Sequence, residues 1–497
     1  MNNISVIMIA HNKKEFIKSQ IEQLSSIHNI SMDSIIIVDN HSSDNLCDFL
    51  VSQSRLNYII CDDKIENYSL ILNTCISEFV NTQNDILILD PDSFLLPETL
   101  KKLSSALNPD NGIYAICPQN ILDISNDIHS FSAALNYVNN TDVSKINLFK
   151  IIKPEINTIL LSHKLLSEHT LFDSEIISDE LCLTDFCINN ILNDQFTYMA
   201  DNVYQYYIGN HNSYYSPTNR NCDLAYIRQK WHMNYINTIP SSNLISMINE
   251  PIDKELNVLE IGCDCGATLL AIQALYPNST PYGIEINPIS AEIASHIASV
   301  KTANIEESVD LWNDIKFDYI LFGDVLEHLR NPSKVIHNCR HILKKKGKII
   351  SSIPNLMHFT VLHELINGNF HYTDTGLLDK THIHFFTYNE IVKMYEENDF
   401  NVINTVASNV TPMLSKKDSE FIDALTKLSS HKSDIQFKAF QYITLAEIKI
   451  YFYRYNNICE PAVIDAFKRL GLHGWEYLSI TYTLSEKYHE THHILIN

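Results

Sequence analysis

Glycine is scarce in this sequence, and several classes of segment are missing from it. Only 11 of 497 residues are glycine, so each remaining glycine is expected to mark a backbone position that needs one. No apolar run approaches the roughly 20 residues of a membrane-spanning helix. The start, MNNISVIMIA, lacks the basic flank and cleavage site of a signal peptide. We therefore expect a cytoplasmic protein without a transmembrane segment, for which peripheral membrane contact stays open.

Positive charge is in the minority. There are 36 Lys and Arg residues against 59 Asp and Glu residues, which gives a formal net charge of −23. A field of that sign repels phosphate backbones, and the longest basic stretch is only LKKKGK. The sequence therefore predicts no nucleic-acid partner.

The eleven cysteines show no repeating spacing. Cys263 and Cys265 stand only two residues apart, which is too close for a standard zinc knuckle. Free thiols in a reducing compartment are expected.

Strands and helices alternate in the first half of the chain. Short apolar runs predict strands at residues 4–10, 34–40 and 56–62 and within 85–100, and a helical pattern follows the first of them. This alternation predicts a parallel sheet wrapped by helices. Ligands of such sheets lie beyond the carboxyl ends of the strands, which is where Asp39, Asp90 and Asp92 fall.

Asp90 and Asp92 form a D-x-D pair directly after the fourth predicted strand. Two carboxylates at this spacing can share Mg²⁺ or Mn²⁺. The cation can bridge a diphosphate and neutralise the charge that develops as the phosphate leaves. The alternative is a helix cap or turn without a ligand.

Together, SVIMIAHNK, IIIVDNHSSDN, ILILDPDSFLLPETL and FDSEIISDELCLTDFC resemble the family 2 glycosyltransferases of GT-A fold over residues 1–235. The resemblance implies a nucleotide-sugar donor and inverting sugar transfer to a glycan or glycoprotein acceptor. It places Asp90 and Asp92 at the metal and diphosphate, and either Asp179 or Glu180 as the base that deprotonates the acceptor hydroxyl. The other donor-binding residues that it implies are Ala10, His11, Asn12 and Asp39.

One position departs from this family. Many members have a histidine after a late strand, where VYQYYIGNH has Gln205. Either His211 substitutes for it or the metal has fewer protein ligands, and this departure puts the activity of the first half in doubt.

The second half contains LNVLEIGCDCGATLLAIQALYP, which reads as strand, turn and helix. A second strand, YGIEINP, ends in Glu285, at the spacing where an acidic residue caps a ribose. With FDYILFGDVLEHL and KGKIISSIPN, this pattern resembles the class I S-adenosylmethionine-dependent methyltransferases. Asp264 replaces the middle glycine of their E-x-G-x-G-x-G pattern. That glycine admits a pyrophosphate in dinucleotide sites, so its replacement favours the sulfonium cofactor over NAD.

The resemblance covers residues 257–447 and implies a set of cofactor contacts. Gly262 and Gly266 would pass close to the methionine moiety, and Glu285 would bind the ribose hydroxyls. Asp264 either faces the cofactor's ammonium group or only forms the turn. His382, in GLLDKTHIHFFT, is the candidate base for methyl transfer to a hydroxyl; the alternative is that it only fixes a loop. The remaining cofactor contacts that it implies are Glu260, Ile286, Asn304, Ile305 and Asp324.

The sequence thus predicts an α/β protein with a GT-A nucleotide-sugar-binding domain (1–235), a helical linker (236–255), a Rossmann-like class I methyltransferase domain (256–447) and a small α+β appendage (448–497). We interpret it as a bifunctional enzyme that transfers a sugar and O-methylates a sugar in a surface or protein-linked glycan. Two alternatives stay open. One is a methyltransferase with a non-catalytic, glycosyltransferase-like binding or scaffold domain. The other is a small-molecule or nucleic-acid methyltransferase with an accessory domain.

Overall fold

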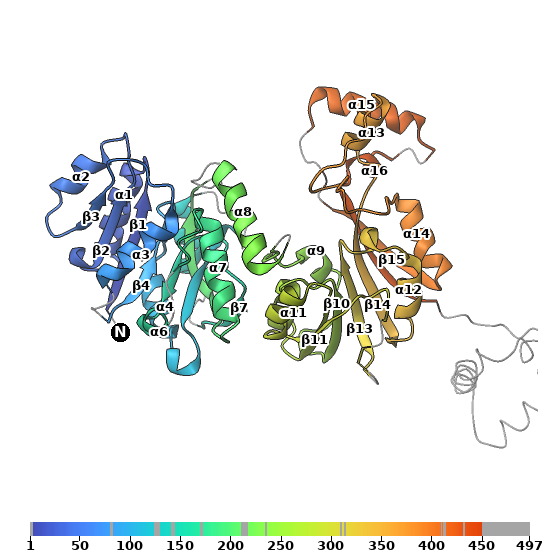
Figure 1. Ribbon diagram of the computed structural model, residues 1–497, viewed down its shortest axis with the longest axis horizontal. Coiled ribbons are helices and arrows are strands. Elements are labelled where there is room, and N and C mark those ends of the chain that lie inside the picture. The colour runs from blue at the N-terminus through green and yellow to red at the C-terminus, as the bar shows by residue number, and fades with distance from the viewer. Residues whose placement is uncertain are drawn as a thin grey trace, which may run out of the picture. The chain divides into compact units, whose positions relative to one another are not determined.

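The structure is a computed structural model. It describes residues 3–79, 83–123, 130–140, 145–168, 172–209, 217–233, 236–308, 311–312, 315–408, 410, 414–430 and 433–449. The appendage predicted at the end of the chain falls almost entirely on residues 450–497, which lie outside the described residues, as does His211. Two β-sheets, one in each half of Met1–Ile448, organise the described part of the chain (Figure 1).

The first sheet has nine strands in the order β3-β2-β1-β4-β8-β6-β9-β5, with β7 paired to β9. Its first four strands are mutually parallel, as predicted. The sheet as a whole is mixed, because β8 runs antiparallel to β4 and β5 runs antiparallel to β9; the prediction of a parallel sheet is wrong for these later strands. The strands are β1 (Ile4–Ala10), β2 (Ile35–Asp39), β3 (Asn57–Ile60), β4 (Asp85–Ile88), β5 (Ser93–Leu95), β6 (Ala115–Asn120), β7 (Leu148–Ile151), β8 (Ile159–Leu161) and β9 (Thr197–Tyr207).

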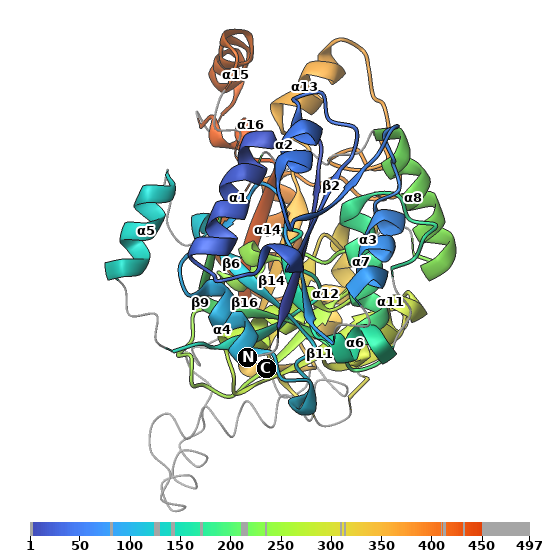
Figure 2. The same ribbon diagram turned by 90° about the vertical axis from the view of Figure 1, so that its left-hand side faces the viewer.

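Helices cover both faces of this sheet. Successive side chains of a strand point to opposite faces, so Val6 and Met8 of β1 pack with α1, α2 and α4, while Ile7 packs with α3, α6 and α7. Figure 2 shows α1 and α4 on one side of β1 and α3 and α7 on the other. The helices of this half are α1 (Lys14–Ser26), α2 (Leu46–Ser52), α3 (Tyr68–Phe79), α4 (Thr99–Ala106), α5 (Phe131–Asn140), α6 (His163–Glu168), α7 (Asp179–Ile191) and α8 (Pro217–Trp231).

The second sheet has seven strands in the order β12-β11-β10-β13-β14-β16-β15. All described pairs are parallel except those of β16, which runs antiparallel to both of its neighbours. The strands predicted in this half are confirmed, and the sheet is the open, doubly wound type. They are β10 (Leu256–Ile261), β11 (Ser279–Glu285), β12 (Ser299–Thr302), β13 (Phe317–Gly323), β14 (Leu343–Pro354), β15 (Phe400–Ser408) and β16 (Gln441–Ile448).

The helices of this half also lie on both faces. Leu259 and Ile261 of β10 pack with α12 and α14, and Leu256 and Val258, on the other face of the strand, pack with α9 and α10. Asn–Pro pairs begin two of these helices: the Asn287 and Asn331 side chains accept hydrogen bonds from the first-turn N–H groups. The helices are α9 (Ser242–Ile245), α10 (Ala267–Leu275), α11 (Pro288–Ser295), α12 (Pro332–Cys339), α13 (Phe359–Ile366), α14 (Tyr388–Glu397), α15 (Lys416–Leu428) and α16 (Ile435–Lys438), with the 3₁₀ turn η5 (Leu326–His328).

Within the predicted linker, residues 236–255, the structure forms the short helix α9. Across the described residues, no helix combines the length and the apolar character needed to cross a bilayer. The ten described cysteines are all free thiols, as expected.

Candidate functional site

Strand β10 stands between β11 and β13, where the strand order of the second sheet reverses. The loops that leave the carboxyl ends of β10 and of its two neighbours carry Gly262, Glu285 and Asp324. A crevice opens at such a point in doubly wound sheets because the two adjacent loops diverge to opposite faces. Residues that the sequence places 62 positions apart therefore meet at one sheet edge.

The glycines after β10 are required by the backbone. Gly262 and Gly266 have φ of 72° and 86°, in the left-handed region that glycine adopts without strain. A Cβ on Gly262 would lie 2.6 Å from Cγ2 of Val325, so this turn packs directly against the segment after β13. The expectation that scarce glycines mark required positions is confirmed here.

Asp264 stands between these glycines with φ of 45°, a conformation that aspartate tolerates better than most side chains. Its Oδ2 accepts a hydrogen bond of 3.0 Å from the backbone N–H of Asn237, and Sγ of Cys265 lies 3.5 Å from Oδ1. Burial raises the pKa of the Asp264 carboxyl. Both roles considered for Asp264, facing the cofactor and forming the turn, are compatible with these contacts.

Glu285, at the end of β11, is buried and anchored by backbone donors. Its Oε2 accepts a bond of 2.9 Å from the N–H of Asp264, and its Oε1 accepts one of 2.8 Å from the N–H of Asn287. Burial nevertheless raises the pKa of this carboxyl. Each oxygen keeps a second lone pair, so a fixed carboxylate can accept two ligand hydroxyls.

Glu260 lies at the end of β10 and is only 4% exposed. Its Oε2 has no hydrogen-bond partner in the described part of the chain, and burial raises its pKa to about 8. A buried carboxylate oxygen without a partner is costly unless the group holds a proton or contacts a cation. The position suits a ligand with an ammonium group, which S-adenosylmethionine has.

The other implied cofactor contacts lie along the same edge. Ile286 follows Glu285 and is 68% exposed, whereas Ile305 is buried. Asn304 accepts the N–H of Glu306 at 3.0 Å through its side chain. Oδ1 of Asp324 accepts the Ser352 hydroxyl at 2.6 Å. An exposed isoleucine beside the buried acid Glu285 is suited to contact the flat face of a base.

Replacing Glu260 by glutamine is expected to change the pH dependence of stability. The folded pKa lies above the unfolded value of about 4.3, so the ligand-free wild type loses stability as pH rises from about 4.5 through about 8. Glu260→Gln should remove this loss, on the order of a few kcal/mol at pH 9, and should weaken cofactor binding. Denaturant unfolding at pH 5 and pH 9 measures it; equal pH slopes for both proteins would contradict it.

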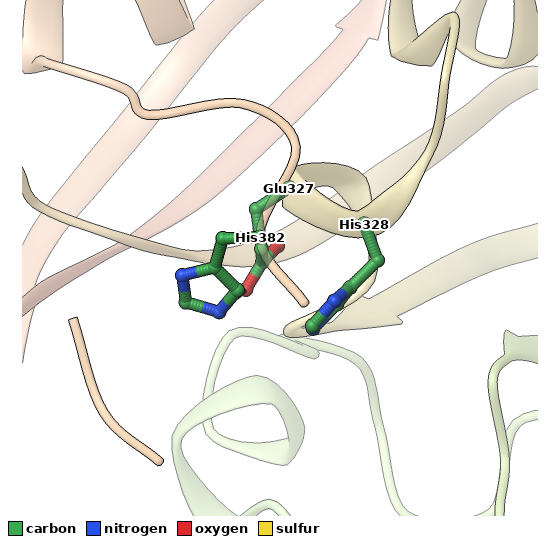
Figure 3. Close-up of side chains that lie close together, drawn as sticks. All are labelled: Glu327, His328 and His382. Atoms are coloured by element: carbon green, nitrogen blue, oxygen red, sulfur yellow. Dashed lines mark ion pairs between the residues drawn. The ribbon is translucent and has the colours of Figure 1, made fainter. Parts of the chain in front are cut away.

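A second cluster lies just beyond β13. Glu327 and His328 belong to η5, and His382 comes from the loop before α14. Figure 3 shows the three side chains drawn together, with one possible ligand atom of each within 4.8 Å of the others. The Glu327 side chain is 1% exposed and the His382 side chain 6%. Burial raises the pKa of Glu327 well above its usual range and lowers that of His382.

His382, the predicted base, is held by the loop that carries it. Its Nδ1 lies 3.2 Å from the carbonyl oxygen of Leu377, and its backbone N–H donates to the carbonyl of Asp379. The ring contacts His328 edge to face, with centroids 4.8 Å apart. Both the predicted catalytic role and the loop-fixing alternative are compatible with this placement.

In the first sheet, the D-x-D pair follows β4, as predicted. Oδ1 of Asp90 accepts the N–H of Asp92 at 2.9 Å, and burial raises the Asp90 pKa to about 7. The Lys13 ammonium lies 2.8 Å from Oδ2 and 2.7 Å from Oδ1 of Asp92. A lysine therefore compensates one of the two carboxylates at the position where a metal was predicted.

Asp179 and Glu180 form the first turn of α7. Asp179 is near enough to Asp90 to raise the pKa of Asp90. Burial raises the pKa of Tyr207, and the charges of Asp90, Asp92 and Asp179 add to this effect. Both acids of α7 line one pocket with His11, the D-x-D pair and Gln205. The structure thus brings together the predicted metal ligands and both predicted bases from two segments that lie far apart in the sequence.

The residues predicted to hold the donor lie at the ends of β1 and β2. Ala10 and Asp39 are almost fully buried. Asp39 accepts the N–H of Ser42 at 2.9 Å, Asn12 accepts the N–H of Ser43 at 2.7 Å, and Nδ1 of His11 lies 2.9 Å from the carbonyl oxygen of Asn40. These contacts tie the two strand ends to one another.

Three residues of these sites were missed by the sequence reasoning as functional side chains: Lys13, Tyr207 and Glu327. Glu327 and His328 stand in the quoted DVLEHL segment, but nothing in that segment indicates that a histidine 54 positions later approaches them. Lys13 and Tyr207 belong to no metal-ligand spacing, so only their contacts reveal them.

A family model described as a methyltransferase domain matches residues 238–405. The ubiquinone biosynthesis O-methyltransferase of Coxiella burnetii is 24% identical over 173 residues, 33% of this chain and 72% of that protein. An uncharacterized protein of Methanocaldococcus jannaschii is 34% identical over 96 residues, 19% of this chain and 43% of that protein. An S-adenosylmethionine-dependent methyltransferase structure from Archaeoglobus fulgidus, 16% identical, aligns with a TM-score of 0.28 over 46% of this chain and 94% of that one.

The family match lies on the second sheet and its surroundings. Together with the sequence relatives, it supports an S-adenosylmethionine-dependent methyltransferase activity in this part of the chain. The match begins beyond the first sheet, so the glycosyltransferase half, its metal and its nucleotide-sugar stay predictions.

Proposed function

We propose that the second sheet carries an S-adenosylmethionine-dependent O-methyltransferase acting on a sugar hydroxyl, and that the first sheet carries an inverting glycosyltransferase. The observation that carries the first part is the set of acids at the switch point. Glu260 and Glu285 are both buried at adjacent strand ends, and Gly262 lets the turn after β10 pass close to Val325, which follows β13. The methylation site is therefore the crevice between β11 and β13.

When bound, S-adenosylmethionine supplies a methyl group on a positively charged sulfur. Glu285 would bind the ribose hydroxyls and Glu260 would pair with the ammonium group. Ile286, Asn304 and Ile305 would flank the adenine. Asp324 would lie beneath the methionine part. Burial has already desolvated the Glu260 carboxylate, so pairing with the ammonium group would give its unpartnered oxygen a charge-assisted contact.

A hydroxyl acceptor fits the cluster beyond β13. The Coxiella burnetii relative is by name an O-methyltransferase, and a hydroxyl is a poor nucleophile that gains from losing its proton during attack. The imidazole of His382 lies in the buried cluster with Glu327 and His328. The methyl donor and a proton acceptor would then lie on the same side of the crevice.

His382→Ala is expected to cut the methylation rate at least a hundredfold. Cofactor affinity should barely change, because His382 lies outside the proposed cofactor contacts. Transfer of labelled methyl groups gives the rate, and calorimetry gives the affinity. His384→Ala is the matched control. Its Nε2 lies 3.2 Å from the carbonyl oxygen of Arg330, and its side chain is not part of the cluster of Glu327, His328 and His382. A loss of cofactor affinity equal to the loss of rate would assign His382 a structural role.

The glycosyltransferase proposal is supported by the convergence of Asp90, Asp92 and Asp179 on one pocket. A divalent ion there would hold the diphosphate of the donor, and Asp179 or Glu180 would take the acceptor proton. Burial raises the pKa of Asp179, which suits a group that must accept a proton near neutral pH. The acceptor would be a glycan or glycoprotein.

The competing interpretation is a methyltransferase whose first sheet only binds a nucleotide or supports the fold. Gln205 and the Lys13–Asp92 ion pair favour it, because a lysine already compensates the charge at the predicted metal site. Assays with labelled S-adenosylmethionine and with labelled nucleotide-sugars, run separately with Mn²⁺, distinguish the two. Methyl transfer without any sugar transfer would support the scaffold interpretation.

A further inference from the structure

The cluster of Glu327, His328 and His382 carries three hydrogen-bond acceptors that face one another. Neither carboxylate oxygen of Glu327 has a hydrogen-bond partner among the described residues, although the side chain is almost completely buried. Unpartnered buried carboxylates are rare because each oxygen has lost its water. Something outside the protein chain is expected to satisfy this one.

The two histidines have their tautomers fixed by the backbone. Nδ1 of His328 lies 3.1 Å from the carbonyl oxygen of Thr381, and Nδ1 of His382 lies 3.2 Å from that of Leu377. A carbonyl oxygen only accepts, so each neutral ring carries its proton on Nδ1 and presents a lone pair on Nε2. Backbone carbonyls orient histidine ligands of metal ions in this same way.

A direct bond between the acid and the imidazole does not explain the arrangement. Nε2 of His382 lies 4.0 Å from Oε1 of Glu327 (Figure 3), which is too long for a hydrogen bond. The ligand atoms all lie within 4.8 Å of one another, whereas those of a tetrahedral zinc ion stand about 3.3 Å apart, given bonds of 2.0–2.1 Å. The Glu327 carboxylate turns easily about its last torsion, so small side-chain rotations can close this gap.

The surrounding charge also favours a cation. Asp324 and Asp379 both act electrostatically on Glu327. Two imidazoles therefore lie among three carboxylates. The loop that carries His382 is fixed to η5, because the N–H groups of Ile383 and His384 both donate to the Glu327 carbonyl. The three ligand positions are held by backbone contacts before any ion binds.

We infer that Glu327, His328 and His382 bind a divalent transition-metal ion, with Zn²⁺ as the preferred species. Two histidines and one carboxylate form a set that zinc uses in catalytic sites, where a further position stays open. Imidazole ligands disfavour Mg²⁺. The cluster follows Val325 in the chain, and Val325 packs against the glycine turn of the proposed cofactor site.

The open position would take the oxygen of the acceptor hydroxyl, an inference that rests on the proposed O-methylation. A zinc-bound hydroxyl group loses its proton near neutral pH, as zinc-bound water does. The proton passes to solvent, the oxygen forms the new bond to the methyl carbon, and the bond from that carbon to the sulfonium sulfur breaks. The sulfur keeps the electron pair and becomes a neutral thioether. His382 would then act as a ligand, with the metal ion doing the work of the base.

The test is zinc binding by the full chain after chelator treatment, measured by titration against a weak competing chelator. One equivalent of zinc should bind to the wild type. Glu327→Gln and His382→Ala should each lower the zinc affinity about 100-fold or more, because losing a ligand costs more than losing a residue that only orients a ligand. His384→Ala is the matched control and should leave the affinity unchanged. The sequence also has three histidines near residue 490, namely His489, His492 and His493, which are a second possible source of zinc binding. A variant in which all three are replaced should still bind one equivalent of zinc.

Substituting Co²⁺ gives a readout independent of activity, because a four- or five-coordinate ion absorbs visible light strongly and a hydrated one does not. We expect these bands in the wild type and His384→Ala, and their loss in Glu327→Gln. Equal affinities for the wild type and Glu327→Gln, or no tight equivalent in the wild type, would overturn the site. Calorimetry with S-adenosylmethionine on the same samples tests the proposed function separately, since the cofactor contacts lie on other residues.

Discussion

Glu285→Ala is expected to weaken S-adenosylmethionine binding by roughly 2–4 kcal/mol, which is about 30- to 1,000-fold in the dissociation constant. The substitution would leave two buried ribose hydroxyls without a charged acceptor. It would also remove the acceptor of the Asp264 and Asn287 N–H groups, which hold the glycine turn and the start of α11. Both losses act on the same crevice.

Titration calorimetry of the full chain measures this effect. Glu285→Gln is the informative companion, since its amide retains one acceptor oxygen and should give an intermediate loss. Glu292→Ala, on the exposed side of α11, should bind like the wild type. An unchanged dissociation constant in Glu285→Ala would remove Glu285 from the cofactor site.

Asp92→Ala is expected to abolish metal-dependent sugar transfer while leaving S-adenosylmethionine binding intact. The substitution removes one of the two predicted metal ligands and leaves the Lys13 ammonium without its partner at 2.8 Å. A free ammonium beside Asp90 would repel a divalent ion. The cofactor contacts lie on the other sheet, so they are unaffected.

Sugar release from labelled nucleotide-sugars, with and without Mn²⁺, gives the rate. Asp48→Ala, an exposed acid of α2, serves as the matched control and should transfer sugar at the wild-type rate. Transfer by Asp92→Ala at that same rate would show that the metal assignment is wrong. If neither the wild type nor the variants transfer sugar from any donor, the scaffold interpretation of the first sheet is favoured.

The strand pattern of the second half was determined by the sequence alone. β-branched runs bounded by glycine, asparagine and proline located β10, β11, β13 and β14, because strand burial imposes a local signal that is independent of the partners. The spacing of Glu260, Gly262 and Glu285 likewise pointed to one crevice, since consecutive strands of a parallel sheet end at the same edge. These features depend on short stretches of chain.

The direction of the later strands in the first sheet was decided by the tertiary structure. An isolated strand such as β8 (Ile159–Leu161) has the same buried, apolar pattern whether it runs parallel or antiparallel to β4. The local sequence does not determine which strands it pairs with. The prediction of a parallel sheet therefore held for β1 to β4 and failed beyond them.

The side-chain partners were also decided by the tertiary structure. The sequence left open whether Asp264 faces a ligand or its own turn, and the structure adds a partner 27 positions away, the backbone N–H of Asn237. Lys13 forms an ion pair with Asp92, 79 positions away in the sequence, and the imidazole of His382 lies 4.0 Å from the carboxylate of Glu327, 55 positions away. Such contacts depend on loop paths that are set by the packing of whole elements, so no local spacing in the sequence predicts them. The sequence determined which strand ends carry acidic residues. Only the tertiary structure decided which lysines, backbone N–H groups and histidines those acids contact.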